Sequence, residues 1–129
     1  MSSLPELLPY SINLEDRLTL VNEHWMPKIV ADYNGNDIMV VKIQGEFQWH
    51  SHPETDDLFL VLQGTLRIEL RHASGEESHV TLRPGELFVV PRGVEHRPVA
   101  EEEVHMLLIE PAGTPNTGDP NTAVYKERI

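Results

Sequence analysis

The chain has 129 residues, no cysteine, and 21 acidic against 10 basic residues, which gives a formal net charge of −11. This length fits one domain, so we expect a single domain over residues 1–129. The absence of cysteine excludes disulfides and thiolate metal ligands, and the negative charge disfavours binding to nucleic acids and to anionic membranes. No stretch approaches the roughly 18 consecutive apolar residues of a membrane span.

The N-terminal region predicts a short helix over residues 13–24. Asn13 is a suitable N-cap, acidic residues follow in the first turn, and one apolar face is formed by Leu14, Leu18 and Val21. Residues 1–17 lack the charged-then-apolar order of a secretory signal. We therefore expect a soluble, cytoplasmic protein.

Short strands separated by turn residues fill most of the remaining chain. The first two, over 28–33 and 37–44, are joined by Asn34-Gly35-Asn36, and Asn-Gly supplies the positive φ that a tight hairpin requires. Further strands are predicted over 65–71, 78–82, 87–90, 96–100 and 104–110, the last two separated by an acidic turn at 101–103. Strands recurring at such short intervals, with little room for helix, predict an all-β sandwich or barrel.

The last nineteen residues differ in composition from the strands. Residues 111–129 mix proline, glycine, asparagine and threonine without a period, which predicts an irregular tail beyond a barrel core of about 36–110. Val124 and Tyr125 could fix the end of this tail to the barrel or to a neighbouring subunit, and a frayed terminus is the alternative.

Three histidines and one acidic residue stand in two short segments, 45–64 and 85–96. His50 and His52 lie two apart in an apparently extended stretch, so their side chains leave the same face about 7 Å apart along it. His96 lies 44 residues beyond His52, so the fold must bring it to the pair. Two imidazoles on one face can share a metal ion, and the pattern predicts a metal site inside a β-barrel.

The two segments resemble the two motifs of the cupin superfamily. The first motif is Gly, five residues, His-x-His, three or four residues, Glu, six residues, Gly, and its places are taken here by Gly45, His50, His52, Asp57 and Gly64. In the second motif, Gly, five residues, Pro-x-Gly, two residues, His, the places are taken by Gly85, Pro91, Gly93 and His96. The resemblance implies a single-domain cupin barrel of the jelly-roll type, or double-stranded β-helix. Small cupins of this kind are often described as similar to mannose-6-phosphate isomerase, but likeness of fold does not confer that reaction.

The resemblance also implies the ligand set of one divalent metal ion, namely His50, His52, Asp57 and His96. The family has Glu where this chain has Asp57, whose carboxylate stands one methylene closer to the backbone, so it reaches the metal directly, through water or not at all. Asp56 is the alternative, but alternation along the strand favours Asp57, which keeps phase with Phe59. Four residues instead of the family's five separate Gly45 from His50, and Ala100 replaces the Asn that ends the second motif.

Three imidazoles and a carboxylate suit borderline metals and leave one or two coordination positions open for water, oxygen or a substrate. The spacing does not choose the metal, and Fe, Mn, Ni and Zn all remain candidates. The residues in phase with the ligands are pocket candidates: Gln48 and Glu46 share the face of the His pair, and Phe59 and Val61 that of Asp57. Each has an alternative place, in the core or at the wet end of a strand.

Three functions are compatible with this pattern. The chain is a metal-dependent enzyme of oxygenase, isomerase or lyase type acting on a small molecule, a small-ligand binding protein without turnover, or a metal-free structural cupin. We favour the enzyme, without a choice of reaction or substrate. Family resemblance also suggests a homodimer, whose interface would use apolar surface such as Trp25, Met26 or Trp49 and avoid the acidic runs.

Overall fold

The computed structural model describes residues 11–129. The first ten residues, part of the stretch used to exclude a secretory signal, lie outside the described residues. The described elements are one short helix and seven strands: α2 (Leu14–Leu18), β1 (Lys28–Tyr33), β2 (Asn36–Glu46), β3 (Asp57–Gln63), β4 (Leu66–Arg71), β5 (Glu77–Leu82), β6 (Leu87–Val90) and β7 (Glu95–Pro111). The predicted all-β class is confirmed.

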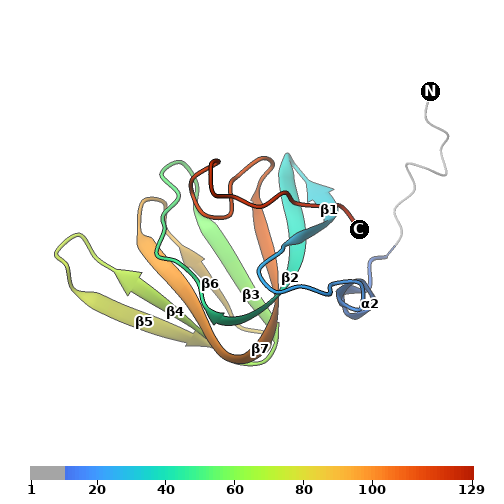
Figure 1. The fold of residues 1–129 in the computed structure, drawn as a ribbon, viewed down its shortest axis with the longest axis horizontal. Coiled ribbons are helices and arrows are strands. Elements are labelled where there is room, and N and C mark those ends of the chain that lie inside the picture. The colour runs from blue at the N-terminus through green and yellow to red at the C-terminus, as the bar shows by residue number, and fades with distance from the viewer. Residues whose placement is uncertain (1–10) are drawn as a thin grey trace.

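The strands form an antiparallel sheet that curls into a small barrel of the jelly-roll type. Five strands follow the order β1-β2-β7-β3-β6, and β4 joins the sheet through β7 and carries β5 on its other side. The long strands β2 and β7 pair along most of their lengths, while the two halves of β7 pair with β4 and β3 in turn. Figure 1 shows β4 and β5 on one side of the molecule and β1 and β2 on the other, with β7 running between them.

The hairpin between β1 and β2 is confirmed at the predicted turn. Tyr33 pairs with Asn36, and the two residues between them have positive φ, 48° at Asn34 and 77° at Gly35. Two consecutive positive φ values define the type I′ turn, whose twist matches that of the flanking strands. The Asn-Gly dipeptide therefore sets the register in which β2 enters the sheet.

The helix is shorter than predicted. Asn13 caps it as expected, since its side chain accepts a hydrogen bond of 3.0 Å from the backbone N–H of Asp16, but the helix ends at Leu18 and not near residue 24. Beyond it the chain crosses to the sheet, where the N–H of Trp25 donates to the carbonyl of Lys42. Trp25 has a φ of 64°, which a right-handed helix cannot include.

The predicted break at residues 101–103 is wrong, because β7 is one strand of 17 residues. The register with β2 shifts here: Ile43 pairs with Val104 and Gly45 with Ala100, so three glutamates stand opposite a single residue. This bulge lets the chain stay extended while the three carboxylates remain exposed. Glu103 also accepts hydrogen bonds of 2.8 Å from His24 and from His105.

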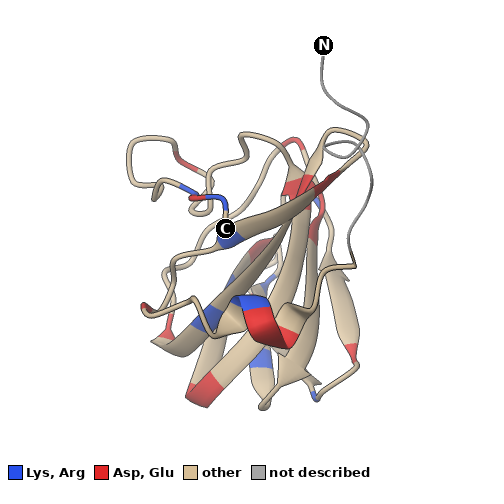
Figure 2. Cartoon of the chain, turned by 90° about the vertical axis from the view of Figure 1, so that its right-hand side faces the viewer, with Lys and Arg blue, Asp and Glu red and all other residues tan. Residues whose placement is uncertain are grey.

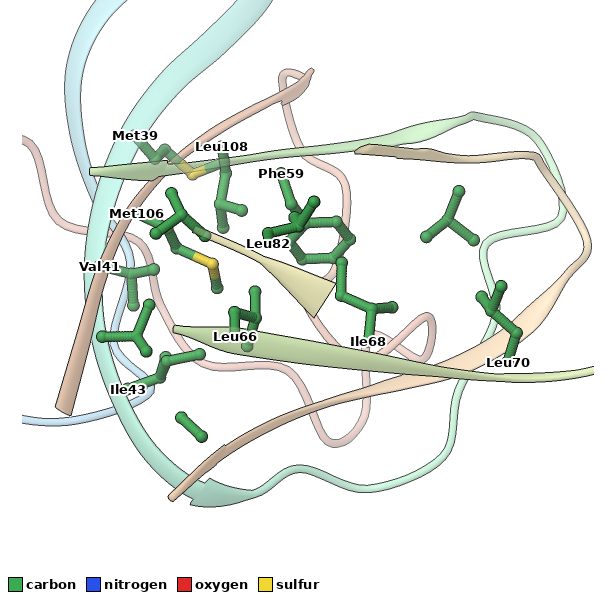
Figure 3. Packing of buried hydrophobic residues seen from close by; sticks show 14 residues of the cluster. Met39, Val41, Ile43, Phe59, Leu66, Ile68, Leu70, Leu82, Met106 and Leu108 are labelled. Carbon is green, nitrogen blue, oxygen red and sulfur yellow. The ribbon is translucent and has the colours of Figure 1, made fainter. Parts of the chain in front are cut away.

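The core lies inside the barrel, and β3 is apolar on both faces. Its inward side chains include the buried Phe59 and Val61, which pack in one cluster with residues of β2, β4, β5, β6 and β7. Figure 3 shows Phe59 meeting Leu82 and Ile68 between the strands. A second cluster outside the barrel packs Leu14, Leu18 and Val21 against Val40, as expected for the apolar face predicted near the N-terminus.

The irregular tail is confirmed, but its end is not frayed. Ile129 and Glu127 exchange backbone hydrogen bonds of 2.9 and 2.8 Å with Ile29 of β1, and Arg128 contacts Asp32 at 2.8 Å. Tyr125 does not pack on the barrel of its own chain, since it is 83% exposed. The tail therefore returns to the barrel and adds to its wall near the site described below.

Acidic residues are spread over several elements, including α2 and strand ends, and are not gathered into one patch in the view of Figure 2. Among residues 11–129, no helix has the length and hydropathy required to cross a lipid bilayer.

Candidate metal centre

The structure brings together the four side chains of the predicted ligand set. His50 and His52 lie in the segment between β2 and β3, Asp57 is the first residue of β3, and His96 is the second residue of β7. His50 and His96 are joined by two backbone hydrogen bonds of 3.0 and 2.9 Å, and the carbonyl of His52 accepts from Gly93. The segment that carries the His pair is therefore held to β7 and to the turn before it.

One ligand atom from each of the four side chains lies within 4.8 Å of the others. The Nε2 atoms of His52 and His96 are each 3.3 Å from the same oxygen, Oδ2 of Asp57, and the rings of His50 and His96 are 4.3 Å apart. All four side chains are buried. A set of this size and composition could hold one metal ion.

The imidazoles are oriented by backbone carbonyls on their far side. Nδ1 of His50 is 3.0 Å from the carbonyl of Gln48, and Nδ1 of His96 is 2.9 Å from the carbonyl of Val94. A carbonyl accepts only, so each Nδ1 carries a proton, and in the neutral ring each Nε2 has a lone pair that faces the centre of the cluster. Outer hydrogen bonds of this kind are typical of histidines that bind metals.

Two buried polar atoms in the cluster lack a hydrogen-bond partner, Nε2 of His52 and Oδ1 of Asp57. Leaving such atoms unpaired in the interior costs about 1–3 kcal/mol each. A metal ion would satisfy both atoms, so the residues present fit a divalent cation. Asp57 is 4% exposed, whereas the alternative, Asp56, faces solvent and accepts a hydrogen bond from the N–H of Arg92.

Burial and mutual charge set the protonation of the cluster. Burial, followed by the charge of His96, lowers the pKa of His50 to about 4. Burial alone would lower the pKa of His52, but the contact with the nearby carboxylate of Asp57, and its charge, raise it overall. Burial by itself would raise the pKa of Asp57, but its close contacts with the imidazoles of His52 and His96 hold that pKa well below its usual range. The cluster therefore offers a carboxylate and at least one neutral imidazole near neutral pH.

A second buried carboxyl group, Glu110 of β7, stands beside the cluster and was not predicted. One of its oxygens lies 3.9 Å from Nε2 of His52, and the other lies 3.3 Å from Nζ of Lys126 in the tail. Lys126 also donates to the carbonyl of Thr114. Burial, and then the charge of Asp57, raise the pKa of Glu110 to about 8 despite the nearby ammonium group. Glu110 therefore stays protonated in much of the metal-free protein at neutral pH.

Glu110 should make the stability of the metal-free protein depend on pH. Its folded pKa of about 8 exceeds its ordinary value of 4.5, so between these values only the folded chain keeps the proton. This contribution is complete below pH 4.5 and is lost as the pH rises through 8, at no more than about 1.4 kcal/mol per pH unit. The free energy of unfolding of the wild type relative to that of Glu110→Gln, both measured with a chelator present, should therefore fall as the pH rises from 4.5 to 8.

The control for this measurement is Glu54→Gln, because Glu54 is exposed. It should keep the pH dependence of the wild type. A Glu110→Gln variant that also keeps that dependence would contradict the assignment.

A cavity opens beside the cluster, and its wall includes His50, Asp57, Phe59 and Glu110. Of the predicted pocket residues, the structure places Phe59 on this wall and Val61 in the core beside it, at 0% exposure. Glu46 and Gln48 are exposed and are not part of the wall.

The places of Glu46 and Gln48 follow from the end of β2. The register shifts between Ile43 and Gly45, and β2 stops at Glu46, so regular alternation does not extend to the His pair. Phe47 lines the cavity instead, together with Trp25, which precedes β1. Trp49 lies elsewhere, with the guanidinium of Arg71 4.0 Å from its ring centroid.

These features define a small antiparallel barrel with a buried cluster of three histidines and one aspartate at its interior. The family model of the Cupin domain matches residues 37–110, which are more than half of the chain. The chain therefore belongs to the cupin family.

Known proteins resemble it to different degrees. The crystal structure of a cupin-2 domain containing protein from Shewanella frigidimarina NCIMB 400 matches with a TM-score of 0.72 and 44% identity, over 78% of this chain and 93% of that chain. An uncharacterized protein of Bacillus subtilis (strain 168) is 29% identical over 68 residues, which are 53% of this chain and 57% of that relative. The chain thus spans little more than half of this curated relative.

A hydroquinone 1,2-dioxygenase from Sphingomonas sp. TTNP3, with 4-hydroxybenzoate bound, has a TM-score of 0.72 at 17% identity, over 81% of this chain and 32% of that chain. At this identity the likeness shows the fold alone.

Proposed function

We propose that this cupin binds one divalent metal ion through His50, His52, Asp57 and His96 and is a metal-dependent enzyme acting on a small molecule. The observation that carries the proposal is the pair of unpaired buried atoms, on His52 and Asp57, in a cluster whose ligand atoms lie within 4.8 Å of one another. Four ligands of this kind leave positions open for a substrate.

The residues of the chain have distinct roles in this proposal. The carbonyls of Gln48 and Val94 fix the rings of His50 and His96, while Asp57 supplies negative charge. A bound divalent ion of Fe, Mn, Ni or Zn would act as a Lewis acid toward a carbonyl or hydroxyl group, or support oxygen chemistry. Glu110, 3.9 Å from His52, is positioned to hold or release a proton at the edge of the site.

The reaction type of this enzyme is left open among oxygenase, isomerase and lyase. A protein that binds a small ligand without turnover is the second candidate. The cavity beside the cluster favours either, because it gives a small molecule access to the ligand side chains. A metal-free structural role would leave two buried polar atoms unsatisfied without a compensating function.

The test begins with the metal content of protein purified without a histidine tag. We expect about one divalent ion per chain, and a His50→Ala variant that retains as much metal as wild type would overturn the proposed site. Oxygen uptake with the iron-loaded but not the zinc-loaded protein, with hydroquinone supplied, would indicate an oxygenase. Retention of a ligand without turnover under any loaded metal would favour the binding protein.

We also propose a homodimer, together with the cytoplasmic location expected from the sequence. Support for self-association comes from β6, an edge strand in which Leu87 is 56% and Val89 is 39% exposed. These side chains lie across from Leu60 and Leu58 of β3, so they form an apolar patch along the edge of the sheet. Sedimentation velocity checks the oligomeric state, and a monomer at all concentrations would contradict it.

A further inference from the structure

The wall of the cavity beside the metal ligands is almost entirely apolar. Aromatic, aliphatic, methionine and proline side chains make up most of it, and its ionisable members are His50, Asp57 and Glu110. The innermost apolar side chains are buried, whereas Trp25, Phe47 and Asn116 are partly exposed. The last three residues therefore mark the side from which a ligand enters.

No lysine or arginine from residues 11–129 lines this cavity. Lys126 contacts a residue of the wall, Glu110, but its ammonium group is already bound by the carboxyl group of Glu110 and the carbonyl of Thr114. The carboxylate of Asp57 on the wall repels anions and competes with them for a bound cation. The site therefore lacks the fixed positive charge that recognises a phosphate or carboxylate group.

The aromatic part of the entrance is held in place by specific contacts. Trp25 and Phe47 stack with ring centroids 4.9 Å apart and planes inclined by 22°, and Phe47 packs edge-on against His50 at 5.2 Å. Trp25 keeps a backbone φ of 64°, and its indole N–H donates to the carbonyl of Gln44. A bulky residue in the left-handed region indicates that the structure fixes this position against local preference.

The cavity is also small. Its volume is about 40 Å³, and a water molecule needs roughly 10–15 Å³, so the inner space admits only a few non-hydrogen atoms. The body of a larger ligand must lie at the entrance, against the stacked pair.

We propose that the ligand of this site is a small uncharged molecule with an apolar or aromatic body, which lies against Trp25 and Phe47 and directs one oxygen atom toward the histidine cluster. Contact between that oxygen and a bound metal rests on the proposed function. The preference for an uncharged apolar body rests on the cavity wall alone.

Phenol and benzoate form a matched pair of probes, because they share a ring but only benzoate is charged at neutral pH. Calorimetric titration of the zinc-loaded and the chelator-treated protein should give a dissociation constant for phenol at least about tenfold below that for benzoate. A Trp49→Phe variant leaves Trp25 as the single tryptophan, since the chain has two, so its emission should change as phenol binds.

Phe47→Leu should weaken phenol binding several-fold, whereas Leu20→Ala, at an exposed position after α2 and away from the cavity, should leave it unchanged. Benzoate binding as tightly as phenol, or phenol binding unaffected by Phe47→Leu in a folded variant, would overturn the inference. Zinc binding without phenol binding would also reject it and leave the metal site standing. Phenol binding to a protein that takes up no zinc would instead support the inference and reject the proposed function.

Discussion

Replacing His96 by alanine is expected to lower the affinity for Zn²⁺ by more than about 100-fold. His96 is 1% exposed, its Nε2 lies 3.3 Å from Asp57, and its ring lies 4.3 Å from that of His50, so it contacts two of the other three ligands. Loss of an outer hydrogen bond alone costs 10–100-fold in metal affinity, and loss of the ligand itself should exceed that range. Isothermal titration calorimetry of the chelator-treated protein measures the change.

His105→Ala is the matched control, because His105 lies on the same strand. Its imidazole contacts Glu103 at 2.8 Å and is not among the clustered ligands. This variant should bind Zn²⁺ as the wild type does. Equal losses in both variants would mean that the effect comes from damage to β7, and unchanged binding by His96→Ala would remove His96 from the site.

Local chemistry made much of the fold predictable. Asn34-Gly35 determined the first hairpin because only residues that tolerate positive φ fit its turn, and both do so here. The clustering of His50, His52, Asp57 and His96 was predictable because their spacing follows a family motif. The uninterrupted course of β7 was not, since three consecutive glutamates resemble a turn until they are known to form a bulge of β7 opposite a single residue of β2.

The pocket was harder to predict than the cluster. Alternation placed Gln48 with His50, but β2 ends before that residue and Phe47 turns inward instead. Trp25 was offered as apolar surface for an interface. Its place on the cavity wall was not predicted, because nothing local indicates its left-handed backbone. Glu110 was missed for lack of any motif around it, although a single carboxylate directly after an apolar run, Met106 to Ile109, is a signal that could have drawn attention to it.

The contact between the tail and the His pair could not be read from the sequence at all, and it leads to the second large effect. A Cβ atom added at Gly118 would stand 2.1 Å from the carbonyl oxygen of Ser51, the residue between His50 and His52. Such a distance is far inside van der Waals contact. Because the atom that it meets belongs to the backbone and not to a flexible side chain, either the tail or the segment that carries the His pair must move. Gly118 also has a φ of 78°, which alanine tolerates poorly.

Gly118→Ala should therefore release the tail or displace the His pair. We expect a loss of about 1–3 kcal/mol in the free energy of unfolding from the forced contact, added to about 1 kcal/mol of backbone strain. The affinity for Zn²⁺ should fall about tenfold, because the segment that orients the two imidazoles shifts. Denaturant unfolding, limited proteolysis of the tail and zinc calorimetry measure the three effects.

Gly113→Ala separates strain from contact. Gly113 has a similar φ of 85°, but a Cβ atom there would meet nothing within 4 Å. This variant should lose only the strain, with zinc affinity unchanged. If the two variants behave alike, the tail does not position the His pair. A loss of zinc affinity confined to Gly118→Ala would instead make the C-terminal segment part of the metal centre, since its close packing on Ser51 would then hold two of the ligands in place.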